Sequence, residues 1–128
     1  MCTAITYQTK DSYFGRNLDY EVSFGEQVVI TPRNYRWKYK CIPKPKCRYA
    51  MMGMAVVEDG YPLYFDAVNE KGLAIAGLHF VGNAYYGPSS EEKSENKFHI
   101  APYELIPFIL SQCDSIAQAK QLLADVRF

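Results

Sequence analysis

The chain begins Met1-Cys2, and Cys2 is the first residue whose chemistry could be catalytic. Removal of the initiator methionine, which a small second side chain permits, would leave a thiol and a free α-amine on one residue. The reference pKa is about 8 for the amine and about 8.5 for the thiol, so the amine can act as the base for its own side chain. This arrangement is that of an N-terminal nucleophile, which attacks a carbonyl group.

Two charged side chains in the following segment could assist this nucleophile. Arg16 and Asp19 come at the end of a short β-prone run, which a Lys-Asp-Ser turn separates from the run that starts after Cys2. If these runs, Thr3–Tyr7 and Tyr13–Asn17, pair as a hairpin, the end of the second lies beside the start of the first. A nearby arginine lowers a thiol pKa, and a carboxylate can hold an ammonium group or orient a thiol proton. A surface Arg–Asp pair without a catalytic role is the alternative.

The remaining cysteines and the two histidines do not form a recognisable metal site. Cys41 and Cys47 are separated by Ile-Pro-Lys-Pro-Lys, a spacing that does not match a zinc knuckle, and only His79 and His99 could add imidazole ligands. The first residues lack the charged-then-apolar layout of a secretory signal, so we expect a cytoplasmic protein with mostly free thiols. We expect no metal ion and no organic cofactor.

The composition argues against several classes of protein. With 128 residues, of which 48% are hydrophobic and 22% charged, the chain suits one folded domain better than a disordered segment. Fourteen basic and fourteen acidic residues cancel, so no net charge attracts the protein to nucleic acid or to an anionic membrane. No apolar stretch approaches the length of a membrane span. We therefore expect a small-molecule partner, and neither nucleic acid nor a membrane.

One segment of the chain has features that favour binding of nucleic acid. Seven of the fourteen basic residues lie between Arg33 and Arg48, a span without an acidic residue. Within it, charged side chains alternate with Trp37 and Tyr39, a pattern that could bind single-stranded nucleic acid. The same alternation is typical of an edge strand whose aromatic side chains pack while the basic ones face water. The zero net charge favours the edge strand.

The elements that must position Cys2 are strands in the first two thirds of the chain. Beyond the hairpin, we predict strands at Gln27–Thr31, Met51–Val57, Pro62–Ala67 and Gly72–Phe80. Met51–Val57 is almost continuously apolar, which is typical of a strand buried on both faces. The run Asn69-Glu70-Lys71-Gly72 predicts a tight connection, in which Asn and Gly supply the unusual dihedral angles.

Two helices are predicted at the end of the chain. The first has Pro102 at its N1 position and a kink at Pro107, and its apolar stripe is Leu105, Ile106, Ile109, Leu110 and Cys113. The second begins with a capping box of Ser115 and Gln118, and its buried face is Ile116, Ala119, Leu123 and Val126. Two helices cannot cover both faces of such a sheet. We therefore expect an α+β fold in which residues 1–128 are an incomplete part of a larger domain.

Several motifs together resemble the N-terminal half of the choloylglycine hydrolases, a family that includes conjugated bile acid hydrolases and penicillin V acylases. The similarity runs in register over essentially the whole chain, and it is far more specific than the Met-Cys start alone. Its motifs are Met1-Cys2-Thr3-Ala4-Ile5-Thr6, Tyr13-Phe14-Gly15-Arg16-Asn17-Leu18-Asp19, Val29-Ile30-Thr31-Pro32-Arg33, the block from Asp66 to Leu78, and Ala101-Pro102-Tyr103-Glu104-Leu105-Ile106-Pro107.

The resemblance implies an N-terminal-nucleophile hydrolase with an αββα sandwich, of which residues 1–128 are a single, C-terminally truncated domain. It implies that Cys2 is the nucleophile, that Asp19 orients the thiol and the amine, and that Arg16 lies beside them. Members of the family are much longer, and their C-terminal half carries a second catalytic Asn and a second Arg, which have no counterpart here. A homo-oligomer of the full-length protein is a further expectation by analogy.

One position departs from the family pattern. His79 stands where bile acid hydrolases typically have Asn, and penicillin V acylases Tyr, as part of the oxyanion hole. A histidine can still donate through its ring or its backbone N–H, and a histidine packed in the core is the alternative. The resemblance places the pocket wall near Tyr20, Phe24 and Phe65, and Asn83 could line the same pocket. Packing in an aromatic core is an equally good interpretation of these four residues.

The resulting hypothesis is that Cys2 hydrolyses the amide bond of glycine- or taurine-conjugated bile acids through a thioester intermediate. The block from Asn69 to Leu78 looks closer to the bile acid branch than to the penicillin branch. One alternative is a penicillin V acylase or another N-acyl amide hydrolase. The other is an inactive fragment or a non-catalytic binding domain, because half of the family's site is absent.

Overall fold

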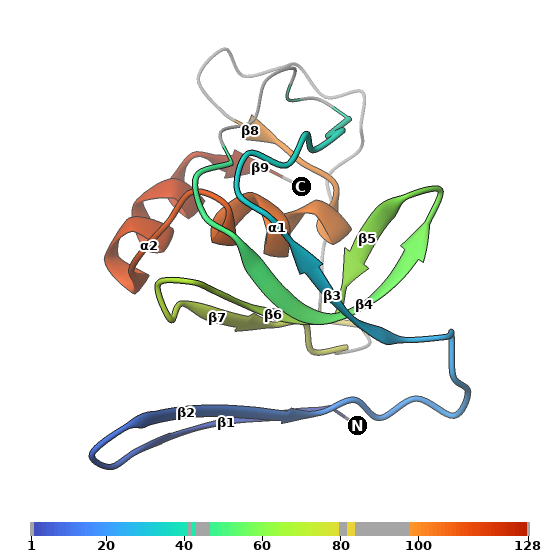
Figure 1. The fold of residues 1–128 in the computed structure, drawn as a ribbon, viewed down its shortest axis with the longest axis vertical. Helices are drawn as coiled ribbons and strands as arrows, with labels where there is room; N and C mark the ends of the chain where they lie inside the picture. Colours follow the sequence, from blue (N-terminus) through green and yellow to red (C-terminus); the bar gives the residue numbers. More distant parts are fainter. Residues whose placement is uncertain (1, 41, 43–46, 80–81, 84–97, 128) are drawn as a thin grey trace.

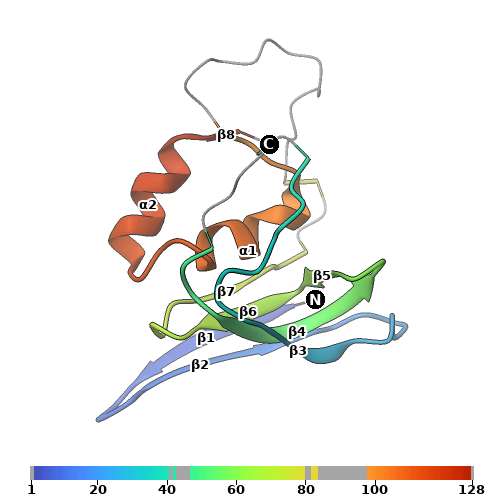
Figure 2. The same ribbon diagram turned by 45° about the horizontal axis from the view of Figure 1, so that its top comes forward.

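The computed structural model of the 128-residue chain describes residues 2–40, 42, 47–79, 82–83 and 98–127. These residues form three stacked layers, which Figures 1 and 2 show from two directions. A layer with the helices α1 (Leu105–Leu110) and α2 (Ile116–Ala124) covers one face of a five-stranded sheet, and a two-stranded hairpin lies on the other side. The described chain is therefore mostly strands followed by two helices, as the sequence predicts.

The hairpin that the sequence predicts at the start of the chain is confirmed. Strands β1 (Thr3–Gln8) and β2 (Ser12–Asn17) pair antiparallel, with Thr3 directly opposite Asn17. In an antiparallel pair, the residue before the first strand lies beside the residues that follow the second. The register therefore brings the segment after β2 next to Cys2.

The five-stranded sheet comes from the middle of the chain. Its strands are β3 (Gln27–Thr31), β4 (Met51–Glu58), β5 (Tyr61–Tyr64), β6 (Asp66–Asn69) and β7 (Ala74–Ala76). They lie in the order β3-β4-β6-β7, and β5 pairs with β4 alongside β6. The prediction of one strand over Pro62–Ala67 is wrong, because the pairing with β4 changes register at Phe65. The predicted strand Gly72–Phe80 is shortened to β7, and Phe80 lies outside the described residues.

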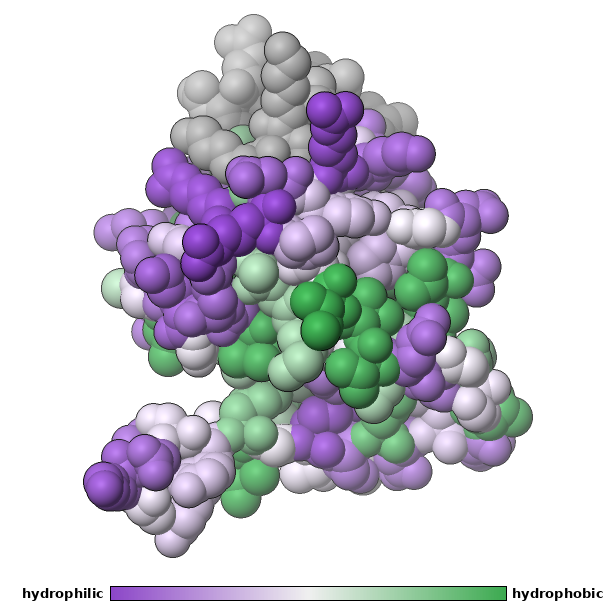
Figure 3. Space-filling view, in the orientation of Figure 1, coloured by the Kyte–Doolittle hydropathy of each residue, from purple (hydrophilic) through white to green (hydrophobic). Residues whose placement is uncertain are grey.

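The prediction that β4 is buried on both faces is wrong for the described chain. Met51 faces the helical layer and is 2% exposed, whereas Met52 and its cross-strand neighbour Ile30 are 47% and 70% exposed. Figure 3 shows apolar side chains gathered over β3 and the neighbouring part of the sheet. The helices cover one face only, and the hairpin leaves part of the second face open, so the apolar run meets solvent there.

The basic segment from Arg33 to Arg48 has irregular backbone where the structure describes it, so the prediction of an edge strand is wrong. The predicted alternation is confirmed, because Trp37 and Tyr39 are buried while the basic side chains beside them face solvent. Trp37 stacks on Tyr39 with ring centroids 5.8 Å apart. The buried Glu104 carboxylate accepts a hydrogen bond from the backbone N–H of Lys40 at 2.8 Å. Tertiary contacts thus position this segment in place of a strand ladder.

The helical layer starts with the 3-10 turn η1 (Pro102–Glu104), in which Pro102 holds the predicted first position. Pro107 lies in the first turn of α1, where its missing N–H costs no hydrogen bond, so the reason for the predicted kink disappears. Ser115 caps α2 as predicted and accepts from the N–H of Gln118 at 3.4 Å. The Gln118 side chain binds the backbone one residue before Ser115 instead of returning to it. The predicted stripe on the first helix is confirmed, with burial or core packing of Leu105, Ile106, Ile109, Leu110 and Cys113.

The predicted buried face of α2 is confirmed at Ala119 and wrong at Ile116 and Leu123. Ile116 is 67% exposed and Leu123 is also exposed, whereas Ala119 and Leu122 pack against the core. Val126 is buried as predicted, but it lies in a strand after the helix. Two short strands pair in parallel there, β8 (Phe98–His99) and β9 (Val126–Arg127). The side of α2 that faces the core therefore runs through Ala119 and Leu122.

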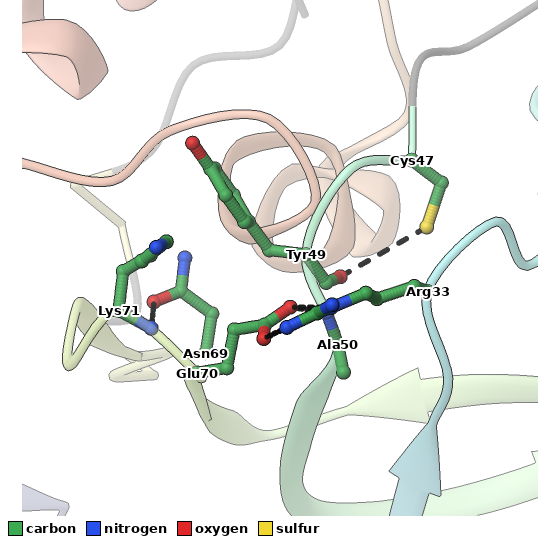
Figure 4. A network of polar contacts seen from close by, with 7 residues as sticks. All are labelled: Arg33, Cys47, Tyr49, Ala50, Asn69, Glu70 and Lys71. Carbon is green, nitrogen blue, oxygen red and sulfur yellow. Dashed lines mark hydrogen bonds and ion pairs between the residues drawn. The ribbon is translucent and has the colours of Figure 1, made fainter.

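The turn between β6 and β7 is fixed by Asn69 and Gly72. Gly72 has φ 81° and supplies the left-handed conformation, as predicted. Asn69 does not adopt an unusual dihedral angle, which corrects the prediction; its Oδ1 instead accepts from the backbone N–H of Lys71 at 3.0 Å. Beside it, Glu70 pairs with Arg33 and accepts a backbone N–H from the residue before β4 (Figure 4). The turn is thereby tied to the segments on both sides of the basic loop.

Candidate active site

Cys2 lies half-buried immediately before β1. Its pKa is lowered from the ordinary thiol value, and the largest cause is a hydrogen bond with the backbone of Asp19. A backbone hydrogen bond from His79 and the charge of Arg16 act in the same direction, and burial opposes them. A hydrogen bond that lowers the pKa of an acid is donated to its anion, so the donors are amide N–H groups. Segments far apart in the sequence thus favour the thiolate of Cys2.

Arg16 links the hairpin to the five-stranded sheet. It projects from β2, and its side chain is only 7% exposed. Its Nη2 donates to the carbonyl oxygen of Gly77 at 2.5 Å, and its Nε lies 3.4 Å from Oδ2 of Asp66. The alternative of a surface pair between Arg16 and Asp19 is therefore wrong, because Arg16 is buried and its ion pair is with a carboxylate of β6.

Asp19 and His79 reach the site through their backbones. Asp19 comes two residues after β2, and His79 comes three residues after β7. Both side chains are exposed, so the alternative of a histidine packed in the core is wrong. The hairpin and the end of β7 bring these two N–H groups to one thiol. The roles predicted for the two side chains stay predictions.

The residues predicted to line a pocket divide into a cluster of three aromatic rings and one separate residue. Tyr20 packs edge-to-face on Phe24, with ring centroids 5.5 Å apart, and against Phe65 at 5.9 Å. Tyr20 and Phe24 are exposed, so packing in an aromatic core is wrong for both. The cluster starts one residue after Asp19, whose backbone contacts Cys2. Asn83 is exposed and lies outside these ring contacts.

A cleft of about 770 Å³ separates the hairpin from the open face of the five-stranded sheet. Apolar side chains of both sheets line most of it, and the polar groups on its walls include Arg16 and Asp66. Cys2 does not line this cleft. We therefore do not assign the cleft to the substrate of Cys2; it reaches the Arg16 ion pair from the space between the two sheets.

Three other features considered in the sequence can be located in the part of the chain that the structure describes. There, no three His, Cys, Asp or Glu side chains come close enough together to hold a metal ion. No helix in the described ranges is both long and apolar enough to cross a membrane. Cys47 and Cys113 are free thiols buried in the core, so Cys2 is the most accessible of the three cysteines described. Cys41 lies outside the described residues.

Comparison with known proteins establishes the family. Residues 2–128 match the model of the linear amide C–N hydrolases, choloylglycine hydrolase family. The chain belongs to the choloylglycine hydrolase family. The resemblance seen in the sequence motifs is thereby confirmed for the N-terminal part of such a protein.

Relatives within the family are named for bile acids. The bile salt hydrolase/transferase of Lactiplantibacillus plantarum is 47% identical over 121 residues, which are 94% of this chain and 36% of that protein. The conjugated bile acid hydrolase of Lactobacillus gasseri is 38% identical over 128 residues, 98% of this chain and 40% of that protein. A crystal structure of a mutant conjugated bile acid hydrolase from Clostridium perfringens matches with a TM-score of 0.82 and 35% identity, over 99% of this chain and 39% of that one. The chain thus spans about 40% of the length of these relatives.

Sequence reasoning assigned no role to Asp66, which the structure places against Arg16. A weak signal is present, because Asp66 is the one acidic residue in an aromatic and apolar run from Tyr61 to Asn69. A carboxylate inside such a strand needs a partner. The sequence does not say which of the many basic residues that partner is.

Proposed function

We propose that the protein is a cysteine hydrolase of linear amides that uses Cys2 as an N-terminal nucleophile. The observation that carries this proposal is the convergence at Cys2, where the backbone N–H groups of Asp19 and His79 and the charge of buried Arg16 all favour the thiolate. The family supplies the class of bond, a linear amide C–N bond. Removal of Met1 is the first requirement, because it frees the α-amine that serves as the base.

The proposed reaction has two steps. The Cys2 thiolate attacks the amide carbonyl carbon, and the backbone N–H of His79 stabilises the oxyanion beside the sulfur. The C–N bond breaks, the amine product leaves with a proton from the α-ammonium group, and a thioester remains. Water then adds to the thioester while the α-amine takes its proton, which releases the acid and restores the thiolate. Asp19 holds the ammonium group, and Arg16 maintains the thiolate.

Glycine- or taurine-conjugated bile acids are the proposed substrates. Support comes from relatives at 36% to 47% identity that are named bile salt hydrolase/transferase or conjugated bile acid hydrolase. The aromatic cluster of Tyr20, Phe24 and Phe65, in which Tyr20 and Phe24 are exposed, offers apolar surface for a steroid acyl group. Asn83 is a further proposed pocket residue. The backbone donor of residue 79 does not depend on its side chain. His79 therefore affects the choice of substrate more than the type of reaction.

We further propose that the three layers are part of an αββα sandwich. Support comes from the match to the N-terminal part of a bile acid hydrolase structure and from the stacking of the hairpin under the five-stranded sheet. Because the chain spans about 40% of its relatives, activity of these 128 residues by themselves belongs to the proposal.

The test measures release of glycine and taurine from conjugated bile acids by the wild-type chain, the Cys2→Ala variant and, as a control, the Cys47→Ala variant. Intact mass first establishes that Met1 is absent. We expect release from the wild type and from Cys47→Ala, and loss of release from Cys2→Ala. Release that Cys2→Ala leaves unchanged would refute the mechanism. The same assay with penicillin V distinguishes a bile acid hydrolase from a penicillin V acylase. If a folded chain that lacks Met1 hydrolyses none of these amides, the result favours a non-catalytic binding domain.

A further inference from the structure

The pairing of β4 with β5 and β6 contains one extra residue. Ala55 lies opposite Tyr64, and Met52 lies opposite Val68. Between these pairs, the two residues 53–54 of β4 face the three residues 65–67 of the partner strand. One extra residue in an antiparallel pair is a β-bulge, which bends the strand and re-aims a side chain.

At the bulge, the two oxygens of the Asp66 carboxylate contact different groups. The backbone N–H of Phe65 donates to the carbonyl of Met54 at 2.9 Å, and the N–H of Met54 donates to Oδ1 of Asp66 at 3.3 Å. A side-chain oxygen thus takes the place of a ladder carbonyl. The second oxygen, Oδ2, lies 3.4 Å from Nε of Arg16. The carboxylate is therefore fixed by the sheet on one side and meets the guanidinium on the other.

Glycine opposite the bulge makes this arrangement possible. A Cβ atom at Gly53 would overlap the carbonyl oxygen of Asp66 and crowd Ala67. Only a residue without a side chain lets the two backbones approach so closely. Gly53 thus permits the bulge, and the bulge places the Asp66 carboxylate.

The Asp66 carboxylate faces the Arg16 guanidinium, a cation whose burial is energetically unfavourable. The Arg16 side chain is more than nine-tenths buried, and its Nε and Nη1 have no hydrogen-bond partner among the described residues. A buried charge without a counter-charge turns toward solvent or is strongly destabilising. The carboxylate of Asp66 and the carbonyl of Gly77 hold this guanidinium in place.

We propose that Asp66 is a positioning residue that holds the Arg16 guanidinium beside Cys2, by means of the bulge between β5 and β6. It does not touch the thiol, and it acts through Arg16. The catalytic consequence rests on the proposed function, but the positioning itself is a property of the thiol and can be measured without an amide substrate.

The experiment follows the rate of Cys2 alkylation by iodoacetamide against pH in the wild type and in Asp66→Asn. Asparagine has the shape of aspartate and keeps the acceptor for Met54, but it removes the charge that holds Arg16. If Arg16 then moves away, the apparent pKa of the thiol rises by about 0.5 units, and the thiolate fraction at pH 7 falls about threefold. Asp59→Asn, in the β4–β5 turn, removes the same charge elsewhere and is expected to leave the profile unchanged.

The sign of the shift separates positioning from simple charge removal. A carboxylate that acted on Cys2 only through space would repel the thiolate, so its loss would lower the thiol pKa. A fall in the apparent pKa, or no change, therefore overturns the proposal. The same substitution in an Arg16→Met background is expected to have no effect. A rise of equal size in that background would show that Asp66 merely supports the sheet, and would overturn the proposal as well.

A second variant covers the case in which Asp66→Asn does not fold, as judged by circular dichroism. Asp66→Glu keeps the charge but displaces Arg16 by one methylene, so we expect a smaller rise of the thiol pKa that again vanishes with Arg16→Met. A shift that persists with Arg16→Met rejects the proposal here too. Amide release is measured separately. A wild type that releases no amine, but whose thiol pKa responds to Asp66 only when Arg16 is present, rejects the proposed function alone. Cys2-dependent release without that response rejects the positioning role of Asp66 alone.

Discussion

Asn69 is a buried polar residue whose removal should strongly destabilise the fold. It is 4% exposed, and its Nδ2 donates to the carbonyl oxygens of Leu110 and Cys113 at 2.9 and 2.7 Å. Its Oδ1 accepts from the N–H groups of Lys71 and Leu73 at 3.0 and 3.1 Å. One side chain therefore joins the β6–β7 turn to the C-terminal end of α1, where helix carbonyls lack intrahelical partners.

Asn69→Ala removes all four of these hydrogen bonds. Each contributes about 0.5 to 1.5 kcal/mol net. Water can replace the bond from the N–H of exposed Lys71 more readily than the bond from buried Leu73 or the two bonds to the end of α1. We therefore expect a loss of about 3 kcal/mol in the free energy of unfolding, which is roughly a 150-fold change in the folding equilibrium. With a urea m-value of about 1.5 kcal/mol/M, the midpoint falls by about 2 M.

The assay is urea unfolding followed by circular dichroism, with Gln8→Ala as the matched control. The Gln8 side chain is exposed and bonds to Ser12 at 2.7 Å and to the Thr9 carbonyl at 3.5 Å, where water can replace it, so its loss should cost less than about 1 kcal/mol. Equal midpoints for the two variants would refute the reasoning.

Asn69→Asp adds a pH dependence to this prediction. A carboxylate would face the two carbonyls at the end of α1, which raises its folded pKa above the unfolded value of about 4. The penalty of the buried charge is then complete above the folded pKa and disappears as the pH falls below the unfolded pKa. A smaller, pH-independent loss stays, because a protonated carboxyl donates one hydrogen bond in place of two. A penalty that does not shrink on acidification would contradict the assigned donor contacts.

Two further predictions concern the sheet and its turn. Arg33 lowers the pKa of Glu70 to about 2, aided by the N–H of Ala50, so this carboxylate stabilises the fold above its unfolded pKa and stops doing so as the pH falls toward 2. The difference in urea midpoint between the wild type and Glu70→Gln should accordingly be present at pH 7 and shrink toward pH 2, and a constant difference would contradict it. Gly53→Ala forces a Cβ against the Asp66 carbonyl and should destabilise by at least about 1 to 3 kcal/mol, whereas Gly15→Ala, whose Cβ meets Ile5 at an ordinary 3.7 Å, should be nearly neutral in the same titration.

Local sequence patterns were sufficient to predict the hairpin and the buried stripe of the first helix. A turn between two β-prone runs predicts their antiparallel pairing, and the observed register brings Arg16 and the backbone of Asp19 to Cys2. The burial of Trp37 and Tyr39 also followed from their alternation with basic residues. In each case the information lies within a few neighbouring residues.

The parts that sequence reasoning missed depend on contacts between distant segments. The ion pair of Arg16 with Asp66 requires a bulge, and the bulge depends on the absence of a side chain at Gly53 on another strand. The error at Leu123 in α2 has a similar origin, since Leu122 and Leu123 both lie at helical spacing from Ala119. Packing against the rest of the molecule selects between them, and periodicity cannot.

The burial of Trp37 also gives the protein an intrinsic spectroscopic probe. It is the one tryptophan of the sequence, and its indole is 5% exposed among the rings of Tyr35, Tyr39 and Tyr61, with centroids 4.8 to 5.8 Å away. Tyrosine rings at such distances pass excitation energy to tryptophan, and water shifts indole emission to longer wavelength. Fluorescence therefore reports whether the basic segment is seated on the core, while the Cys2 site, on a different part of the chain, can be labelled without disturbing that signal.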